Sequence, residues 1–334
     1  MNNAHRFNPL STTRRQLAAL GLATLAGLAC TPLLAQTAPF PSRAITLLLP
    51  FPPGSATDAA VRALGPVVSK TLGQPVVIEN RPGAGGTLAA GMLAQNGNPD
   101  GHTLAVAPAT LFKVPHLQKV PYDPMTGLSY VMAFSAYTFA LVVPEASPWK
   151  TWQEFAAYAK ANPGKLNFGT TGTGSSGHVA IHMLGKKIGV DLNVIPFKGG
   201  AEVLQAFVGG HINAVIDGGW AQVERQGKGR VLLAFTDKRI ARLPQVPTAR
   251  EAGIDLVANS PIGLVAPKGV DPKVMRVLHD AFKGALADPA YRKHLETFDL
   301  EDAYLSGDDY FKLASRLWVD EKRNLEALGL TAER

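Results

Sequence analysis

Cysteine is almost absent from this chain of 334 residues. The single cysteine, Cys30, lies within the first 38 residues, which we expect to be removed during export. The mature chain is therefore expected to carry no thiol. This absence excludes cysteine catalysis, thiolate metal sites and disulfides in one step.

The first 38 residues are typical of a secretory signal peptide, which predicts a periplasmic location. Three arginines and no acidic residue flank an apolar core at 17–29, and small residues follow where cleavage is expected, near 35–38. The apolar core is too short to span a membrane. Residues 13–17 also resemble a twin-arginine signal, so the Sec and twin-arginine routes both stay open.

Long runs of like charge are also missing. Without the three leader arginines, 30 basic residues stand against 26 acidic ones, a net charge of +4, and they are scattered along the chain. Nucleic-acid binding therefore gets no support, and only a mild bias toward small anions remains. An apolar content of 46% with 18% charged residues fits a globular protein.

Strand and helix patterns alternate along the mature chain and indicate an α/β fold. Residues 45–49 form a continuous apolar run of strand length, and the helix-capping sequence Ser-Ala-Thr-Asp follows at 55–58. Further strands are expected at 75–79 and 103–107, on either side of a helix at 86–95. A second alternation begins near residue 150. We expect two lobes, each a mainly parallel sheet flanked by helices.

Two apolar segments that end in proline, 140–144 and 263–267, enclose the second alternation. They suggest that the chain crosses between the lobes twice. The first domain would then comprise 39–141 plus 263–334, and the second domain 142–262. The last helix is expected to pack back on the first lobe.

The first candidate site is the strand–helix junction at 50–58. Ligands of open α/β sheets bind at the carboxyl ends of strands. The helix start there offers N–H groups and the hydroxyls of Ser55 and Thr57 to a carboxylate. The same residues also suit an ordinary helix cap, and Asp58 fits a partner of the helix dipole better than a catalytic acid.

The second candidate site is the glycine-rich segment at 166–178. Gly172, Gly174 and Gly177 satisfy G-x-G-x-x-G between a strand and a helix, as a dinucleotide site requires. The acidic residue expected at the end of the next strand is missing, because Asp191 lies at that strand's start. A smaller anion fits better, and a dinucleotide-dependent oxidoreductase that uses 172–177 is the alternative.

Other catalytic patterns are missing. No G-x-S-x-G elbow surrounds Ser175 or Ser176. His178 and His182 stand four apart on one helix face without the Glu of a zincin motif, so no metal site and no cofactor are expected. We expect His178 to anchor the loop by a hydrogen bond. Asp217, at a strand's end, either caps the next helix or accepts hydrogen bonds from a ligand.

Seven ordered sequence blocks are similar to one known family. From Phe40 onward the chain resembles the periplasmic solute-binding receptors of tripartite tricarboxylate transporters, of the Bordetella uptake gene type. The blocks are residues 50–54, 79–86, 99–104, 121–124, 172–178, 196–200 and 243–248.

The resemblance implies a two-lobed periplasmic binding protein, type II-like, with its ligand in the interlobe cleft. It implies no enzyme activity, a small carboxylate as ligand (a dicarboxylate, tricarboxylate, amino acid or aromatic acid), and membrane components of the transporter as partners. In this family two loops grip the ligand carboxylate, partly through water. The matching residues are Phe51, Gly54, Ser55, Ala56 and Asp58 on one side, and Thr170, Thr171, Thr173, Gly174 and Ser175 on the other.

Two departures from the family pattern lie at the expected site. Ser55 stands where the family usually has a second glycine, and Gly218 stands where it usually has Asn after the strand-end Asp. The identity of the carboxylate therefore does not follow from the resemblance.

Overall fold

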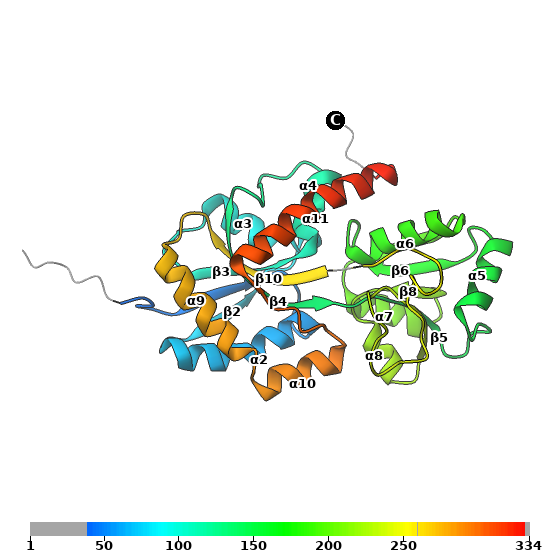
Figure 1. Ribbon diagram of the computed structural model, residues 1–334, viewed down its shortest axis with the longest axis horizontal. Helices are drawn as coiled ribbons and strands as arrows, with labels where there is room; N and C mark the ends of the chain where they lie inside the picture. Colours follow the sequence, from blue (N-terminus) through cyan, green and yellow to red (C-terminus); the bar gives the residue numbers. More distant parts are fainter. Residues whose placement is uncertain (1–38, 259, 331–334) are drawn as a thin grey trace, which may run out of the picture. The chain divides into compact units, whose positions relative to one another are not determined.

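The structure is a computed structural model that describes residues 39–258 and 260–330. The expected signal peptide and its cleavage region lie outside the described residues. The described strands form two sheets, each with helices on both faces (Figure 1). We call each sheet with its helices a lobe.

The sheet of the first lobe has a parallel part and an antiparallel part. β1 runs parallel to both β2 and β3, whereas β10 runs antiparallel to β3 and β4. The strand order is β11 (Leu305–Ser306), β4 (Leu128–Tyr137), β10 (Ser260–Pro267), β3 (Thr103–Pro108), β1 (Ile45–Leu49) and β2 (Val76–Asn80).

Alternate side chains of these strands fill two separate cores. Ile45, Leu47 and Leu49 of β1 point to one face, and Ala105 and Ala107 of β3 point to the other. The first face is covered by α2 (Ala56–Leu72), α9 (Pro272–Ala285) and α10 (Pro289–Phe298); the second is covered by α3 (Leu88–Asn96) and α11 (Gly307–Ala327). Three short helices, η1 (Ala84–Gly86), η2 (Ala109–Phe112) and α4 (Val114–Leu117), complete the first lobe.

The second lobe repeats the arrangement with fewer strands. β6 runs parallel to β7 and β8, and β5 runs antiparallel to β8 and β9. The order is β7 (Asn193–Phe197), β6 (Asn167–Thr171), β8 (Ala214–Ile216), β5 (Ala140–Pro144) and β9 (Gly229–Ala234). Its helices are α5 (Trp152–Ala161), α6 (Ser176–Ile188), α7 (Gly200–Val208) and α8 (Trp220–Arg225).

Both sheets are mixed rather than mainly parallel. The crossover strands β5 and β10 explain the difference, because each pairs antiparallel with both of its neighbours. The chain passes from the first sheet to the second between Tyr137 and Ala140, and it has returned by Ser260. The boundaries expected at 141 and 263 therefore fall inside β5 and β10.

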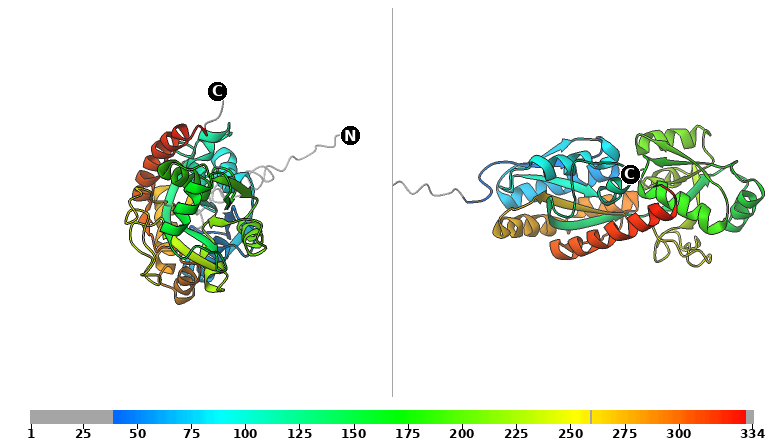
Figure 2. Two further views of the ribbon diagram at one scale, coloured as in Figure 1. Left: turned by 90° about the vertical axis from the view of Figure 1, so that its right-hand side faces the viewer. Right: turned by 90° about the horizontal axis from the view of Figure 1, so that it is seen from above.

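The C-terminal helices α9, α10 and α11 pack on the sheet of the first lobe. Asp271 and Asp288 cap α9 and α10, each with a proline in the first turn. Tyr310 of α11 is fully buried, and its hydroxyl donates to Ala107 O at 3.1 Å. Figure 2 shows α11 running along the first lobe. Among the described helices, none has the length and apolar character needed to cross a membrane.

Candidate ligand-binding site

The two predicted loops have the same construction. The β1–α2 loop (residues 50–55) ends at Ser55, whose Oγ accepts a hydrogen bond from Asp58 N at 3.2 Å. The β6–α6 loop (residues 172–175) ends at Ser175, whose Oγ accepts one from His178 N at 3.1 Å. Each cap satisfies one N–H group of its helix, and the other first-turn N–H groups have no intrahelical acceptor. Both helix starts can therefore receive an anion.

Asp58 organises the β1–α2 loop. Its carboxylate accepts from Gly54 N at 2.9 Å, from Arg62 Nε at 3.0 Å and from Asn80 Nδ2 at 2.8 Å. In a complete capping box the Asp58 carboxylate would accept a hydrogen bond from Ser55 N. Here it accepts one from Gly54 N instead. Asn80 also donates to Phe51 O at 2.9 Å, which fixes the loop to β2. With its acceptor sites occupied, Asp58 shapes the loop, and its contact with a ligand stays a prediction.

The pKa of Asp58 lies below its ordinary value. Burial acts to raise the pKa, but the hydrogen bonds from Arg62, Asn80 and Gly54 outweigh burial and lower it. A lowered folded-state pKa contributes stability that is present above the unfolded pKa of 3.8 and is lost as the pH falls through the folded pKa.

Asp58→Asn is therefore expected to lose about 1.5–3 kcal/mol of unfolding free energy at neutral pH, in line with charge-assisted hydrogen bonds. The difference from wild type should shrink below about pH 4, as measured by urea denaturation across a pH series. Asp308→Asn makes the same charge change at the exposed start of α11 and serves as the control. A difference that does not vary with pH would refute the role given to Asp58.

Asp217 holds the second loop in a similar way. Its carboxylate accepts from Thr171 N at 3.0 Å, from the Thr171 hydroxyl, and from Gly219 N at 3.1 Å. Burial raises the pKa of Asp217, although these three hydrogen bonds act against the rise. The bond to Gly219 lies at the start of α8, and a contact of Asp217 with a ligand stays a prediction. The two bonds from Thr171 fix that residue, so Asp217 positions the loop.

The remaining residues of the second loop differ in exposure. Thr170 is fully buried, with Oγ1 3.4 Å from Ser175 Oγ, whereas Thr173 at the loop's tip is exposed. A Cβ on Gly177 would lie 2.1 Å from Ile216 O, so this glycine allows α6 to pack tightly on β8. The third glycine of the motif therefore has a packing role.

His178 is bonded to the loop through its backbone rather than through its ring. The backbone N–H of this residue binds Ser175, while the ring atom Nδ1 has no hydrogen-bond partner among the described residues. The ring lies 4.7 Å from that of His182. Burial and the neighbouring His182 lower the pKa of His178 to about 4, so the ring is neutral at physiological pH.

Residues of the first lobe touch the second loop directly. Lys113 Nζ donates to Ser176 Oγ at 2.6 Å and pairs with Glu321 Oε1 at 3.2 Å, although only 2% of Lys113 is exposed. A Cβ on Gly174 would lie 2.2 Å from Leu117 Cδ1. These contacts bring the β6–α6 loop against η2 and α4. The sequence analysis did not single out Lys113 as a residue of the site. The one signal in the sequence is that Lys113 is a single charged residue among the apolar residues of 111–114.

The first loop contributes an aromatic ring that lies beside η1 and the end of β3. The Phe51 ring lies 3.4 Å from the Cβ position of Gly86, next to Pro108 and Thr110. Ala56 is almost fully buried and accepts from His294 Nε2 at 3.1 Å through its carbonyl. The structure thus gathers Phe51, Gly54, Ser55, Ala56 and Asp58 at the carboxyl ends of β1, β2 and β3.

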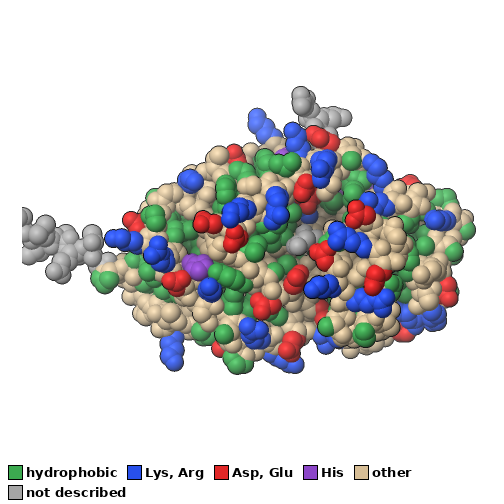
Figure 3. Space-filling model, viewed as in Figure 1, with side chains coloured by type: hydrophobic (Ala, Val, Ile, Leu, Met, Phe, Trp, Pro, Cys, Tyr) green, Lys and Arg blue, Asp and Glu red, His purple; other side chains and the backbone are tan. Residues whose placement is uncertain are grey.

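The arrangement offers little to a dinucleotide or a metal. β7 ends at Phe197 and is followed by the exposed Lys198, so no carboxylate stands where a ribose would need one. Within residues 39–258 and 260–330, no group of three His, Cys, Asp or Glu side chains is placed to hold a metal ion. Figure 3 shows charges of both signs scattered over one face of the molecule.

The two lobes and their paired helix starts define a solute-binding protein of the two-lobed α/β class. The family model for the tripartite tricarboxylate transporter family receptor matches residues 60–330. A protein of Cupriavidus necator, described as "UPF0065 protein in gbd 5' region", is 46% identical over 315 residues, which cover 94% of this chain and 96% of the relative.

Solved structures agree with this result. The periplasmic binding protein BugD gives a TM-score of 0.80 at 26% identity and covers 88% of this chain and 100% of its own. MatC from Rhodopseudomonas palustris with bound malate gives 0.76 at 30% identity, covering 86% and 100%. A second R. palustris protein, with adipate, gives 0.81 at 26% identity, covering 87% and 99%. The chain belongs to the tripartite tricarboxylate transporter receptor family, and its role is that of a solute-binding receptor.

Proposed function

We propose that this receptor works in the periplasm, where it binds a small carboxylate between the β1–α2 and β6–α6 loops and delivers it to membrane components of a tripartite tricarboxylate transporter. The observation that carries the proposal is the pair of serine-capped helix starts, both at strand ends and both with N–H groups available. Malate and adipate, the ligands of the two R. palustris neighbours, make a carboxylate the ligand chemistry to test.

In this proposal, N–H and O–H dipoles bind the ligand carboxylate, and no salt bridge is needed. The carboxylates nearest the loops, Asp58 and Asp217, are occupied by backbone and side-chain donors, and the Lys113 ammonium is paired with Glu321. Backbone N–H groups and the hydroxyls of Thr173 and Ser175 are then the donors for the ligand, because the Thr171 hydroxyl already donates to Asp217. Donors held in place before binding need little reordering when the ligand arrives.

Isothermal titration of the exported chain against mono-, di- and tricarboxylates, amino acids and aromatic acids tests the proposal. At least one carboxylate is expected to bind saturably. Ser175→Ala should weaken that binding about tenfold, the loss of roughly one hydrogen bond to a charged group.

Ser306→Ala is the matched control, because Ser306 caps α11 through Asp309 N at 3.2 Å in the same geometry. Both variants should lose about 1 kcal/mol of stability, and only Ser175→Ala should lose affinity. Saturable binding of NAD without binding of any carboxylate would refute the proposal.

A further inference from the structure

Tyr137 contacts both lobes at the point where the chain crosses between them. It is the last residue of β4, and its hydroxyl lies 2.6 Å from Thr57 Oγ1 in the first turn of α2. Its ring packs against the main hydrophobic core of the first lobe and against a core of the second. One side chain thus links the helix start of the first loop with the second lobe.

On the second lobe the ring lies against Gly218. A Cβ on Gly218 would be 2.5 Å from Cδ1 and 3.0 Å from Cε1 of Tyr137. The ring therefore occupies the space that any side chain at 218 would need. Gly218 directly follows Asp217, which holds the β6–α6 loop, so the ring stands beside the elements that support both loops.

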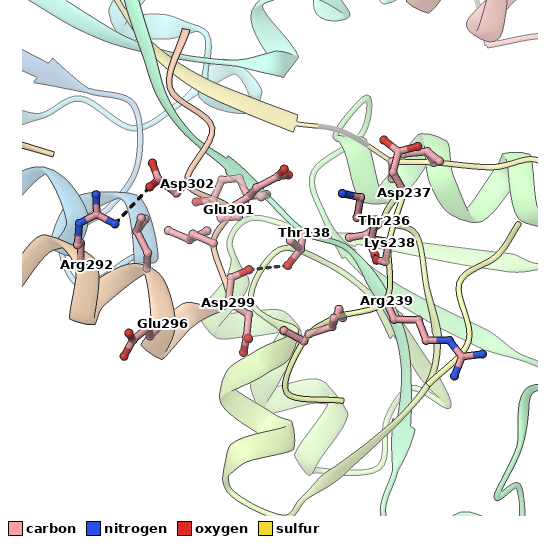
Figure 4. A pocket seen from close by; sticks show the side chains of 17 residues that line it. Thr138, Thr236, Asp237, Lys238, Arg239, Arg292, Glu296, Asp299, Glu301 and Asp302 are labelled. Atoms are coloured by element: carbon pink, nitrogen blue, oxygen red, sulfur yellow. Dashed lines mark hydrogen bonds and ion pairs between the residues drawn. The ribbon is translucent and has the colours of Figure 1, made fainter. Parts of the chain in front are cut away.

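Tyr137 also lines a groove of about 710 Å³, whose other lining residues are drawn in Figure 4. Tyr137 and Thr138 form one wall, and residues 236–241 and 295–302 form the others. The groove is rich in charged side chains, including Lys238, Arg239 and Asp302. Thr138 Oγ1 donates to Asp299 O at 2.6 Å, which fixes the wall to the first lobe. Tyr137 therefore borders this groove and also contacts Thr57 and Gly218.

We infer that Tyr137 closes one end of the ligand site and limits the chain length of the carboxylate that the receptor accepts, so that short-chain carboxylates are its ligand class. This inference rests on the proposed function. With its carboxylate held at the helix starts, a short ligand ends before the ring, whereas a longer chain collides with it. The position of the ring also depends on Gly218, because any side chain at 218 would displace the ring.

The phenol is suited to such a boundary because it remains uncharged. Burial raises the pKa of Tyr137 to about 12, and the nearby Asp217 acts in the same direction while Thr57 opposes it. A neutral ring does not repel a carboxylate by charge. Selection at this end of the site therefore depends on length and shape.

Titration of two homologous series, acetate to octanoate and succinate to suberate, tests the inference. Wild type is expected to favour the short members. In Tyr137→Ala the site opens into the groove, and the affinity of the longest members relative to the shortest should rise at least about tenfold. Tyr137→Leu, which keeps apolar packing on both cores, should shift the same ratio in the same direction if the alanine variant folds poorly.

Tyr158→Ala removes the same atoms from the exposed side of α5 and should leave the ratio unchanged. If Tyr137 acted only as a hinge between the lobes, its replacement would weaken the binding of short and long ligands equally. An unchanged ratio of long-chain to short-chain affinity in folded Tyr137→Ala or Tyr137→Leu would therefore overturn the inference. If wild type and both variants bind no carboxylate of any class, the proposed function itself fails.

Discussion

Replacing Gly174 with leucine is expected to weaken ligand binding by about 100-fold or more, while the free energy of unfolding falls by only about 1–2 kcal/mol. The small stability loss comes from the backbone, because Gly174 has φ +78°, a conformation that costs other residues energy. The large binding loss comes from Leu117, since a Cβ at 174 would lie 2.2 Å from its Cδ1. Leu117 belongs to the first lobe, so the collision opposes the approach of the lobes rather than folding.

Gly189→Leu separates the two effects. Gly189 ends α6 with φ +69°, and no heavy atom lies within 4 Å of its Cβ position. It should show the same modest loss of stability with wild-type affinity. Calorimetric titration together with urea denaturation measures both quantities. Gly174→Leu with intact affinity, or with a stability loss far greater than that of Gly189→Leu, would contradict this role for Gly174.

The local architecture could be predicted from the sequence because short-range chemistry determines it. Apolar runs predicted strands at 45–49 and 103–107, which match β1 and β3 closely. The capping sequence at 55–58 forms its hydrogen bond from Asp58 N to Ser55 Oγ, because the two residues are only three apart. The mixed sheets were missed, since the direction of a crossover strand depends on residues far away in the chain.

The contacts around the site depend on long-range packing and were missed for the same reason. Lys113 and Ser176 are 63 residues apart, and Thr57 and Tyr137 are 80 apart. The chemistry of a lysine or a tyrosine alone names no such partner. The sequence also does not reveal that the hydrogen bond from His178 to Ser175 comes from the backbone and not from the ring.

The three glycines of the G-x-G-x-x-G motif have different structural roles, which the motif alone does not reveal. Gly172 and Gly174 have positive φ, and only Gly174 contacts the other lobe. Gly177 has helical geometry within α6 and lies against the backbone of β8. In a dinucleotide site the third glycine also serves close helix–strand packing. The resemblance to that motif therefore reflects shared packing and needs no nucleotide.

Gly177→Ala is accordingly expected to be the most destabilising single-methyl change in the site. The added Cβ would lie 2.1 Å from Ile216 O and 2.3 Å from Thr170 Oγ1, and a backbone carbonyl within a sheet cannot move aside cheaply. A loss of about 3 kcal/mol of unfolding free energy is expected from such overpacking.

Gly284→Ala is the control that isolates this cause. Gly284 is also a helical glycine, in α9, but no heavy atom lies within 4 Å of its Cβ position. Alanine is the better helix former, so Gly284→Ala should stabilise the protein by about 0.5–1 kcal/mol. Urea denaturation of both variants should therefore give opposite signs. If Gly177→Ala is as stable as wild type, α6 does not depend on close contact with β8, and the start of α6 is not fixed in the way the proposed carboxylate site requires.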